Sequence, residues 1–521
     1  MGEDFRLNDL EKLTIPQLVK TQAEKLTSKS ALISESETIS FGDLDIFSTN
    51  IASHLIEHGI LPGDRAAIWA PNMNEWVLAA IAIHKAGGVV VPINTRMKGK
   101  EAAYILNNSE AKILFSVKNF LGIDFFELLE NEDLPYLKMQ VSLDSEAASS
   151  GDLIFSKLKI NPLDTELPDI KGNDMADIIF TSGTTGKPKG VISSHLQNIK
   201  VFDYWSTYIG LNENDRYLIV NPFFHTFGYK AGWLASLMRG ATAYPCPIFD
   251  ADKIIRIINE HKISMLPGPP TLYQSILTSN LIHTLDISSL RLGVTGAASI
   301  PVQLIKDMKE RLGFETVITA YGLTESTGVV TMCTPDDDYE TIATTSGCAI
   351  ADVQVKCVDH EGQKVTAGEP GEILVKGYNI TQGYFNNPEA TQEAIDSDGW
   401  LHTGDIGILD QNGYIKITDR SKDMFIVGGF NAYPAEIENI LCDHSAISQV
   451  AVIGIADERM GEVAKAFIVL KPNHELEKDS LLQWCKDNMA NYKVPREIEF
   501  VNELPTNAAG KVMKYLLKDD S

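Results

Sequence analysis

Short apolar runs alternate with longer amphipathic segments through the first ~420 residues. The run at 65–69 is typical of a buried strand, and the pattern at 74–86 has the spacing of a helix. Gly87–Gly88 ends that helix before the next apolar run at 89–93. The same order recurs at 241–244, 250–261 and 264–267, and at 290–295, 300–312 and 316–321. A strand–helix–strand rhythm of this kind predicts a parallel sheet covered by helices.

The pattern changes after about residue 345, where short alternating segments are separated by frequent turns. The segments at 353–358, 372–376 and 413–418 predict an antiparallel β subdomain. A domain boundary is expected near 419–423, and about 100 residues follow with their own alternation at 436–442, 447–454, 464–470 and 481–489. We therefore expect an α/β protein. Its large N-terminal domain, 1–420, would hold parallel α/β subdomains and the β subdomain, and a small α+β domain would occupy 421–521.

The composition fits a globular protein of more than one domain. A chain of 521 residues is too long for one hydrophobic core, and its 44% hydrophobic and 22% charged residues are ordinary values. The net charge of -25 argues against non-specific nucleic-acid binding and against docking on an anionic membrane surface. An anionic nucleotide would therefore need a local positive site.

The six cysteines form no C-x-x-C pair and no ligand-like cluster, which favours a reducing compartment and no structural zinc. No apolar run approaches the roughly 18 residues that span a bilayer, so no transmembrane segment is expected. The N-terminus is polar and lacks the apolar core of a secretion signal. These features together predict a cytoplasmic protein.

The segment at 178–191 reads I-I-F-T-S-G-T-T-G-K-P-K-G-V and is the strongest candidate for chemistry. Its hydroxyls, glycines and ammonium groups follow an apolar run and suit the phosphates of a nucleotide. These candidates are Thr181, Ser182, Gly183, Thr184, Thr185, Gly186, Lys187 and Lys189. An exposed turn after a strand is the plainer interpretation. A Walker A loop is excluded, because Gly183 lies only three residues before Gly186 and a proline follows Lys187.

Seven segments, in order, carry a resemblance to a known family. The first is the loop just described, and the others are P-F-F-H at 222–225, A-Y-G-L-T-E at 320–325, D-G-W-L-H-T-G-D at 398–405, D-R-S-K-D at 419–423, G-G-F-N-A-Y-P-A-E-I-E at 428–438 and P-T-N-A-A-G-K at 505–511. From about residue 15 onward, the chain resembles the adenylate-forming superfamily, and within it the bacterial CoA ligases of fatty and alicyclic acids. This resemblance implies ATP-dependent formation of an acyl-adenylate, its transfer to CoA, and a mobile C-terminal domain.

The resemblance implies the catalytic residues. Lys511 would bridge the substrate carboxylate and the α-phosphate, where negative charge concentrates in the first transition state. Glu325 would hold Mg²⁺ and Thr324 would contact phosphate; one carboxylate with phosphate oxygens is an ordinary Mg²⁺ site. His225 would stand beside the acyl pocket and gate it. Each of these residues, taken alone, also has an ordinary structural explanation, such as a surface lysine, a helix N-terminus or a packed histidine.

Further roles follow from the same resemblance. Tyr321 would stack on adenine, Asp405 would accept the ribose hydroxyls, and Arg420 would contact ribose or phosphate. Other residues implied to bind the nucleotide or CoA are Gly296, Ala297, Gly322, Gly428, Gly429 and Phe430, the last three lining the pantetheine route. Lys422 would be the hinge of the C-terminal domain.

The sequence limits the acid that is activated. Amino-acid adenylating relatives carry an aspartate near 222–232, but no acidic residue lies between Asp215 and Asp250. A simple carboxylic acid is therefore expected, either a medium- or long-chain fatty acid or a bulky alicyclic propionate of the kind left by steroid breakdown. Transfer to a carrier-protein thiol, luciferase-type oxidation and a non-catalytic binding protein are the alternatives. A homodimer is left open.

Overall fold

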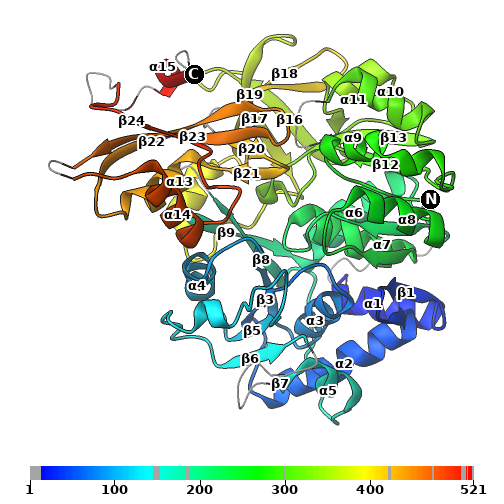
Figure 1. Ribbon diagram of the computed structural model, residues 1–521. Coiled ribbons are helices and arrows are strands. Elements are labelled where there is room, and N and C mark those ends of the chain that lie inside the picture. Colours follow the sequence, from blue (N-terminus) through cyan, green and yellow to red (C-terminus); the bar gives the residue numbers. More distant parts are fainter. Residues whose placement is uncertain are drawn as a thin grey trace.

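The computed structural model describes residues 13–144, 153–182, 187–296, 300–420, 424–471, 474–505, 512 and 514–518. Figure 1 shows a large α/β part, coloured from blue to yellow, and a smaller α+β part in orange and red beside it. The predicted fold class is confirmed by the sheets of the two parts.

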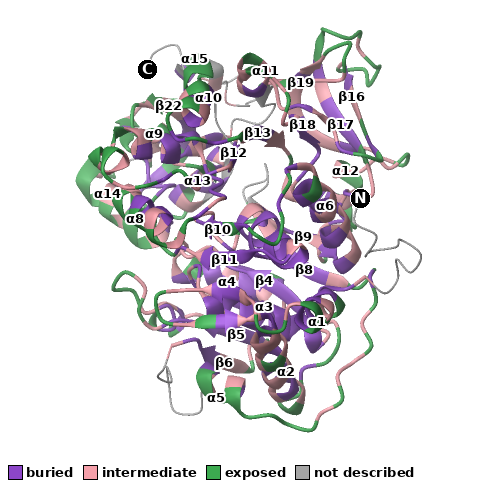
Figure 2. Ribbon diagram, turned by 90° about the vertical axis from the view of Figure 1, so that its right-hand side faces the viewer, coloured by how far each residue is buried: buried purple, intermediate pink, exposed green. Residues whose placement is uncertain are grey.

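The first sheet is almost wholly parallel. Its order is β7-β6-β5-β3-β4-β8-β9, and only the last pair is antiparallel. The strands are β3 (Arg65–Trp69), β4 (Val89–Pro92), β5 (Ile113–Ser116), β6 (Met139–Ser142), β7 (Leu153–Ile154), β8 (Met175–Ser182) and β9 (Pro188–Ser194). Every residue of β4 and β5 is buried, as Figure 2 shows in purple. Continuous burial explains why these strands are apolar runs without alternation.

In a second group of strands, the pairs β10–β11, β1–β11 and β12–β13 are parallel, and the outer pairs are antiparallel. Its first four strands have the order β10-β11-β1-β2, and four more have the order β12-β13-β14-β15. Their bounds are β1 (Ser30–Ile33), β2 (Thr38–Ser40), β10 (Arg216–Ile219), β11 (Thr242–Pro245), β12 (Leu292–Thr295), β13 (Thr316–Tyr321), β14 (Thr331–Met332) and β15 (Cys348–Ala349). The run at 264–267, expected as a strand, forms only single bridges from Met265 to Tyr217 and Leu292. Those bridges link the two sets of strands.

The predicted β subdomain is an antiparallel meander. It contains β16 (Val353–Val358), β17 (Pro370–Gly377), β18 (Leu401–Leu409) and β19 (Ile415–Arg420), in chain order. The smaller part of the molecule has the order β21-β20-β23-β22, with β24 parallel to β23. Its strands are β20 (Phe425–Val427), β21 (Phe430–Ala432), β22 (Ile447–Asp457), β23 (Gly461–Leu470) and β24 (Glu497–Phe500).

Helices surround these sheets. In the large part they are α1 (Ile15–Lys25), α2 (Phe41–Glu57), α3 (Asn74–Lys85), α4 (Gly99–Asn108), α5 (Phe155–Ile160), α6 (His195–Tyr208), α7 (Ala235–Arg239), α8 (Ala251–His261), α9 (Pro270–Thr278), α10 (Val302–Glu310), α11 (Tyr339–Thr344) and α12 (Pro388–Ala394). Short turns are η2 (Glu127–Leu129), η4 (Asn280–His283) and η5 (Thr324–Ser326), and η3 (Phe227–Leu234) is a π-helix. The smaller part has α13 (Pro434–Cys442), α14 (Lys478–Asn488) and α15 (Lys514–Lys518).

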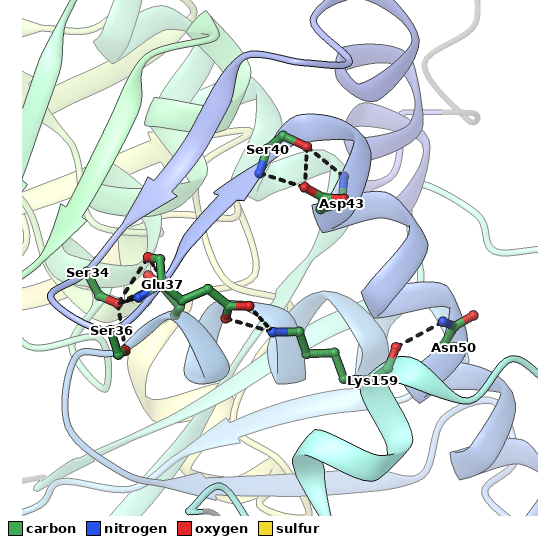
Figure 3. Close-up of polar contacts among 8 residues, drawn as sticks. Ser34, Ser36, Glu37, Ser40, Asp43, Asn50 and Lys159 are labelled. Atoms are coloured by element: carbon green, nitrogen blue, oxygen red, sulfur yellow. Dashed lines mark hydrogen bonds and ion pairs between the residues drawn. The ribbon is translucent and has the colours of Figure 1, made fainter.

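Local polar contacts fix the start of α2 and the loop before it (Figure 3). The hydroxyl of Ser40 accepts from the backbone N–H of Asp43 at 3.0 Å, and the carboxylate of Asp43 accepts in return from the N–H of Ser40. This reciprocal capping satisfies two donors that a helix end leaves without partners. Nearby, Nζ of Lys159 donates to Glu37 at 2.7 Å, which ties α5 to the turn before β2.

The apolar core is divided in the same way as the sheets. One continuous core runs from Ile15 to Ile415, and a second, from Phe425 to Ile498, lies in the C-terminal part. A smaller C-terminal cluster holds Ala451, Ile453, Phe467, Leu504 and Leu517. The boundary expected between 420 and 421 stays a prediction, because residues 421–423 lie outside the described residues. No helix within the described ranges is long and apolar enough to cross a membrane.

Candidate active site

The candidate phosphate loop connects an antiparallel hairpin. Thr181 on β8 pairs with Lys189 on β9, and Ser182 pairs with Pro188. A P-loop of the Walker type joins a strand to a helix, so this hairpin agrees with the exclusion made from the sequence. Tyr104 of α4 donates to the carbonyl of Pro188 at 3.2 Å and braces the end of the hairpin.

The carboxylate of Glu325 lies against this hairpin. The hydroxyl of Thr181 donates to Oε1 of Glu325 at 3.3 Å, and the phenol of Tyr384 donates to the same oxygen at 2.9 Å. Burial and the nearby carboxylate raise the pKa of Tyr384 far above its usual value, so it stays a neutral donor. Nζ of Lys189 lies 5.3 Å from the centre of the Tyr384 ring. The hydroxyls of Thr181 and Tyr384 therefore bind the carboxylate of Glu325, and the ammonium of Lys189 lies over the Tyr384 ring.

Two residues predicted to bind the nucleotide lie at the carboxyl ends of two parallel strands. Gly296 follows β12, and Tyr321 ends β13, its parallel neighbour. The phenol of Tyr321 donates to Oδ2 of Asp405 at 2.6 Å. Asp405 on β18 is paired with Arg420 on β19, so the meander brings these two sequence-predicted residues together. Ligands of α/β proteins bind outside the carboxyl ends of parallel strands, where these residues lie.

A tight backbone crossing shapes the loop that carries Thr324 and Glu325. A Cβ on Gly322 would lie 2.3 Å from the carbonyl oxygen of Gly328, so a side chain there would collide with main chain. Gly328 has a φ of +102°, a conformation that favours glycine. A Cβ on Gly328 would lie 2.5 Å from the methyl carbon of Thr226. The Y-G-L-T-E loop is thereby pressed against the segment that carries His225.

His225 lies just before the π-helix η3. It is exposed, and its Nδ1 accepts from the backbone N–H of Phe227 at 3.3 Å. Phe227 packs edge-on against Trp205, with ring centroids 5.9 Å apart. The segment that follows His225 is therefore aromatic, with Phe227 partly exposed and Trp205 fully buried behind it, and π-helical turns often occur at functional sites.

Behind this aromatic side lies a buried ion pair that the sequence did not reveal. Lys230 on η3 and Asp177 on β8 are both fully buried, with Nζ and Oδ1 3.0 Å apart. Nζ of Lys230 also donates to Ser193 on β9, and Asn198 donates to Asp177 at 2.6 Å. The pair thus connects η3 to both strands of the phosphate-loop hairpin.

The turn of the β20–β21 hairpin faces the large part of the molecule. Val427 pairs with Phe430, which leaves Gly428 and Gly429 as a two-residue turn with φ of +56° and +88°. Two positive φ angles define the tight hairpin turn that glycine permits. A Cβ on Gly429 would lie 3.8 Å from Pro269, and the guanidinium of Arg96 lies 4.4 Å from the centre of the Phe430 ring.

Several predicted residues lie outside the described residues: Gly183, Thr184, Thr185, Gly186, Ala297, Lys422 and Lys511. Only the backbone of Ser182 and Arg420 is described, and Lys187 is an exposed residue next to the hairpin. Tyr384 was missed by the sequence analysis. It lies 59 positions beyond Glu325, and only the fold brings its hydroxyl to that carboxylate.

Comparison with known proteins agrees with this geometry. Residues 19–385 match the model of the AMP-binding enzyme family, and residues 436–511 match that of the AMP-binding enzyme C-terminal domain. The chain therefore belongs to the family of AMP-binding enzymes. The predicted class, an AMP-forming acyl-CoA ligase, is confirmed by its relatives.

One such relative is the 3-[(3aS,4S,7aS)-7a-methyl-1,5-dioxo-octahydro-1H-inden-4-yl]propanoyl:CoA ligase of Rhodococcus jostii (strain RHA1), which is 44% identical over 519 residues, covering 97% of this chain and 98% of the relative. A human mitochondrial medium-chain acyl-CoA ligase is 30% identical, covering 98% of this chain and 88% of that protein. The solved structure of a double mutant of o-succinylbenzoate CoA synthetase from Bacillus subtilis, with a product analogue, is 28% identical. It superposes with a TM-score of 0.84 over 97% of this chain and 98% of that chain.

Proposed function

We propose that this enzyme activates a bulky alicyclic propionate with ATP and Mg²⁺ and transfers the acyl group to CoA. The observation that carries the choice of acid is the partly exposed ring of Phe227, which lies next to His225 and is backed by the fully buried Trp205. Such a surface suits a bulky apolar acyl group and offers no carboxylate to an α-amino group. The 44% identity to the Rhodococcus ligase favours a fused-ring propionate over the medium-chain fatty acids of the human relative.

The first half-reaction joins the acid to AMP. An oxygen of the substrate carboxylate forms a bond to the α-phosphorus of ATP, and the bond to the pyrophosphate oxygen breaks. Lys511 is proposed to stabilise the negative charge that gathers between the two reactants. The hydroxyls and lysines of the 181–189 hairpin are proposed to hold the phosphates, with Asp405 and Tyr321 at the ribose and adenine.

Glu325 fits a magnesium site. Its Oε1 accepts hydrogen bonds from the hydroxyls of Thr181 and Tyr384, which orient the carboxylate. Among the described residues no cluster of three or more acidic, histidine or cysteine side chains could hold a metal by itself. A single carboxylate completed by phosphate oxygens of ATP is the usual arrangement for Mg²⁺, which would neutralise charge on the leaving pyrophosphate.

In the second half-reaction the sulfur of CoA forms a bond to the acyl carbon, the bond to the AMP oxygen breaks, and the thiol proton is released. Gly428, Gly429 and Phe430 are proposed to line the route of the pantetheine arm, because the two glycines let it approach the backbone closely. Lys422 is proposed as the hinge that lets the C-terminal domain serve both half-reactions.

The test is pyrophosphate release with ATP and Mg²⁺ across a panel of acids, with and without CoA. The panel contains fused-ring and single-ring propionates, hexanoate, octanoate, palmitate, benzoate and an α-amino acid. CoA-dependent turnover that is fastest with the fused-ring propionate supports the proposal. Faster turnover with octanoate would reassign the substrate, and pyrophosphate release that CoA does not stimulate would favour a carrier-protein thiol as acceptor.

A further inference from the structure

The C-terminal part of the molecule meets the large part through a fully buried ammonium group. Nζ of Lys493 lies 2.7 Å from Oε1 of Glu436, in its own core, and 2.6 Å from Oε1 of Glu101, on α4 of the large part. The Lys493 side chain is 1% exposed, and the two glutamates are 6% and 10% exposed. This three-residue cluster, Glu101–Lys493–Glu436, consists of two ion pairs that share Lys493 and links the large part to the C-terminal part.

The charges of this cluster depend on one another. Burial by itself lowers the pKa of Lys493, but Glu436 and Glu101 outweigh that effect and raise it well above the usual value. Lys493 is therefore a permanent cation at any physiological pH. Among the described residues Oε2 of Glu436 has no hydrogen-bond partner, so the cluster depends on Lys493 for its neutralisation. If the domains separated, Glu101 and Lys493 would each lose a partner that burial makes strong.

Glu101 belongs to the rigid frame of the large part. Its second oxygen, Oε2, accepts from the backbone N–H of Lys98 at 2.8 Å and caps the start of α4. The residue is therefore held by its own helix before it meets Lys493. An oriented carboxylate loses little side-chain entropy when it binds an ammonium, which makes it an effective anchor.

The same interface carries the turn proposed for CoA. The ring of Tyr492, next to Lys493, stacks on Phe430 with centroids 5.1 Å apart, and the guanidinium of Arg96 lies 4.4 Å from the centre of the Phe430 ring. Gly429 is beside Pro269. A link between Glu101 and Lys493 thus holds the 428–430 turn against the large part of the molecule.

We infer that Glu101 is a positioning residue for the thioester-forming half-reaction, acting by locking the C-terminal part in the orientation seen here. On the side that this orientation turns toward the large part, Gly429 lies beside Pro269 and Phe430 lies under Arg96, and both residues are uncharged. An uncharged, glycine-lined face suits a thiol arm that attacks a mixed anhydride, whereas adenylation needs positive charge between two anions. This inference rests on the role proposed above for Gly428, Gly429 and Phe430.

The test separates the two half-reactions in Glu101→Gln. Glutamine keeps a capping oxygen for the N–H of Lys98, so α4 still has its N-terminal cap, but it removes the charge that faces Lys493. We expect thioester formation from a supplied acyl-adenylate to fall roughly 10- to 100-fold, the worth of a hydrogen bond to a charged group. Adenylate formation in the absence of CoA should be unchanged or faster.

Asp64→Asn is a matched control. Asp64 is also 10% exposed, binds a lysine (Lys112) at 2.6 Å, and accepts with its other oxygen from a backbone N–H three residues earlier, that of Leu61. Both partners of Asp64 lie in the large part of the molecule, so its loss should not separate the half-reactions. Equal losses of both half-reactions in Glu101→Gln, or no loss in either, would overturn the inference.

Hydrogen–deuterium exchange gives a readout that does not require activity. In Glu101→Gln, exchange at 425–432 and at the start of α4 should accelerate, while β3 to β5 stay protected. Unchanged exchange at 425–432 would also overturn the inference. If the wild-type enzyme forms no CoA thioester with any acid, the proposed function fails, but the exchange experiment still decides whether Glu101 holds the C-terminal part in place.

Discussion

The phenol of Tyr321 donates a hydrogen bond to Oδ2 of Asp405, and the two oxygens are 2.6 Å apart. These residues are 84 positions apart in the chain and come from the parallel sheet and the antiparallel meander, respectively. The bond joins two subdomains at the place where adenosine is proposed to bind. It also orients a carboxylate that is proposed to accept both ribose hydroxyls.

Substitutions of Asp405 and Tyr321 should distinguish the proposed ribose contact of Asp405 from the effect of Tyr321 on the orientation of that carboxylate. Asp405→Asn removes the charge that would accept both ribose hydroxyls, and we expect the KM for ATP to rise roughly 10- to 100-fold. Tyr321→Phe keeps the ring and loses the bond to Asp405, so a rise of about fivefold is expected. Initial rates of pyrophosphate release against ATP concentration measure both values. A larger effect for Tyr321→Phe than for Asp405→Asn would contradict the proposed ribose contact.

Tyr384→Phe tests whether the phenol orients Glu325. Without its 2.9 Å hydrogen bond the carboxylate is less well placed, and we expect the Mg²⁺ concentration for half-maximal adenylation to rise roughly tenfold. Tyr104→Phe is the control, because its phenol bonds the carbonyl of Pro188 at the end of the same hairpin but does not touch Glu325. The same Mg²⁺ dependence in the wild-type and Tyr384→Phe enzymes would show that this bond has no part in metal binding.

Lys230→Met should destabilise the large domain strongly. The substitution leaves the fully buried carboxylate of Asp177 without its cation, which typically costs about 3–5 kcal/mol. Burial already raises the pKa of Asp177 and lowers that of Lys230, so neither charge is stable alone. Urea unfolding of Lys230→Met, Asp177→Leu and the double variant measures the coupling. If the double variant is no more stable than Lys230→Met alone, the pair does not account for the loss.

Local patterns predicted most of the strands and helices, but not which distant segments would pair or contact one another. The strands at 316–321 and 353–358 were predicted with the bounds that β13 and β16 have, because each is a short apolar or alternating run between turns. The run at 264–267 has the same local pattern, but it forms only single bridges through Met265. Pairing depends on neighbouring strands, and a single segment does not record it.

The same difference holds for the candidate site. Thr181, Glu325, Tyr321 and Asp405 could be predicted because they lie in motifs with recognisable spacing. Tyr384 and Lys493 could not, because their partners lie 59 and 392 positions away and are chosen by packing. The buried pair of Lys230 was hidden for the same reason, since a lysine next to an aromatic run gives no sign of its carboxylate.

The unfolding free energy should decrease on mild acidification through His195. This residue is buried on α6, where it accepts from the backbone N–H of Ile15, and burial lowers its pKa from 6.5 to about 3. The unfolded chain therefore takes up a proton near pH 6.5 that the folded chain refuses, so this stability is present above pH 6.5 and is lost as the pH falls toward 3. Between pH 7 and pH 5 the loss is about 2 kcal/mol.

Urea unfolding of the wild-type enzyme and of His195→Gln at pH 7 and pH 5 measures this loss. Glutamine does not titrate but can still accept the hydrogen bond of Ile15, so the variant should lose about 2 kcal/mol less than the wild type over this interval. Equal losses in both proteins would mean that His195 takes up its proton in the folded state at an ordinary pKa.

Lys511→Ala should affect one half-reaction only. The proposed ammonium acts where the carboxylate meets the α-phosphate, and removing a charge stabiliser of this kind typically costs roughly 100- to 1,000-fold in rate. Adenylate formation should fall by that factor, whereas thioester formation from a supplied acyl-adenylate should persist, because the second step needs no cation between two anions. Lys514→Ala is the control, since its ammonium binds Glu438 at 2.7 Å three positions further along the chain. Equal loss of both half-reactions in Lys511→Ala would contradict this assignment, and a comparable loss of adenylation in Lys514→Ala would show that the C-terminal segment matters through its fold and not through one ammonium group.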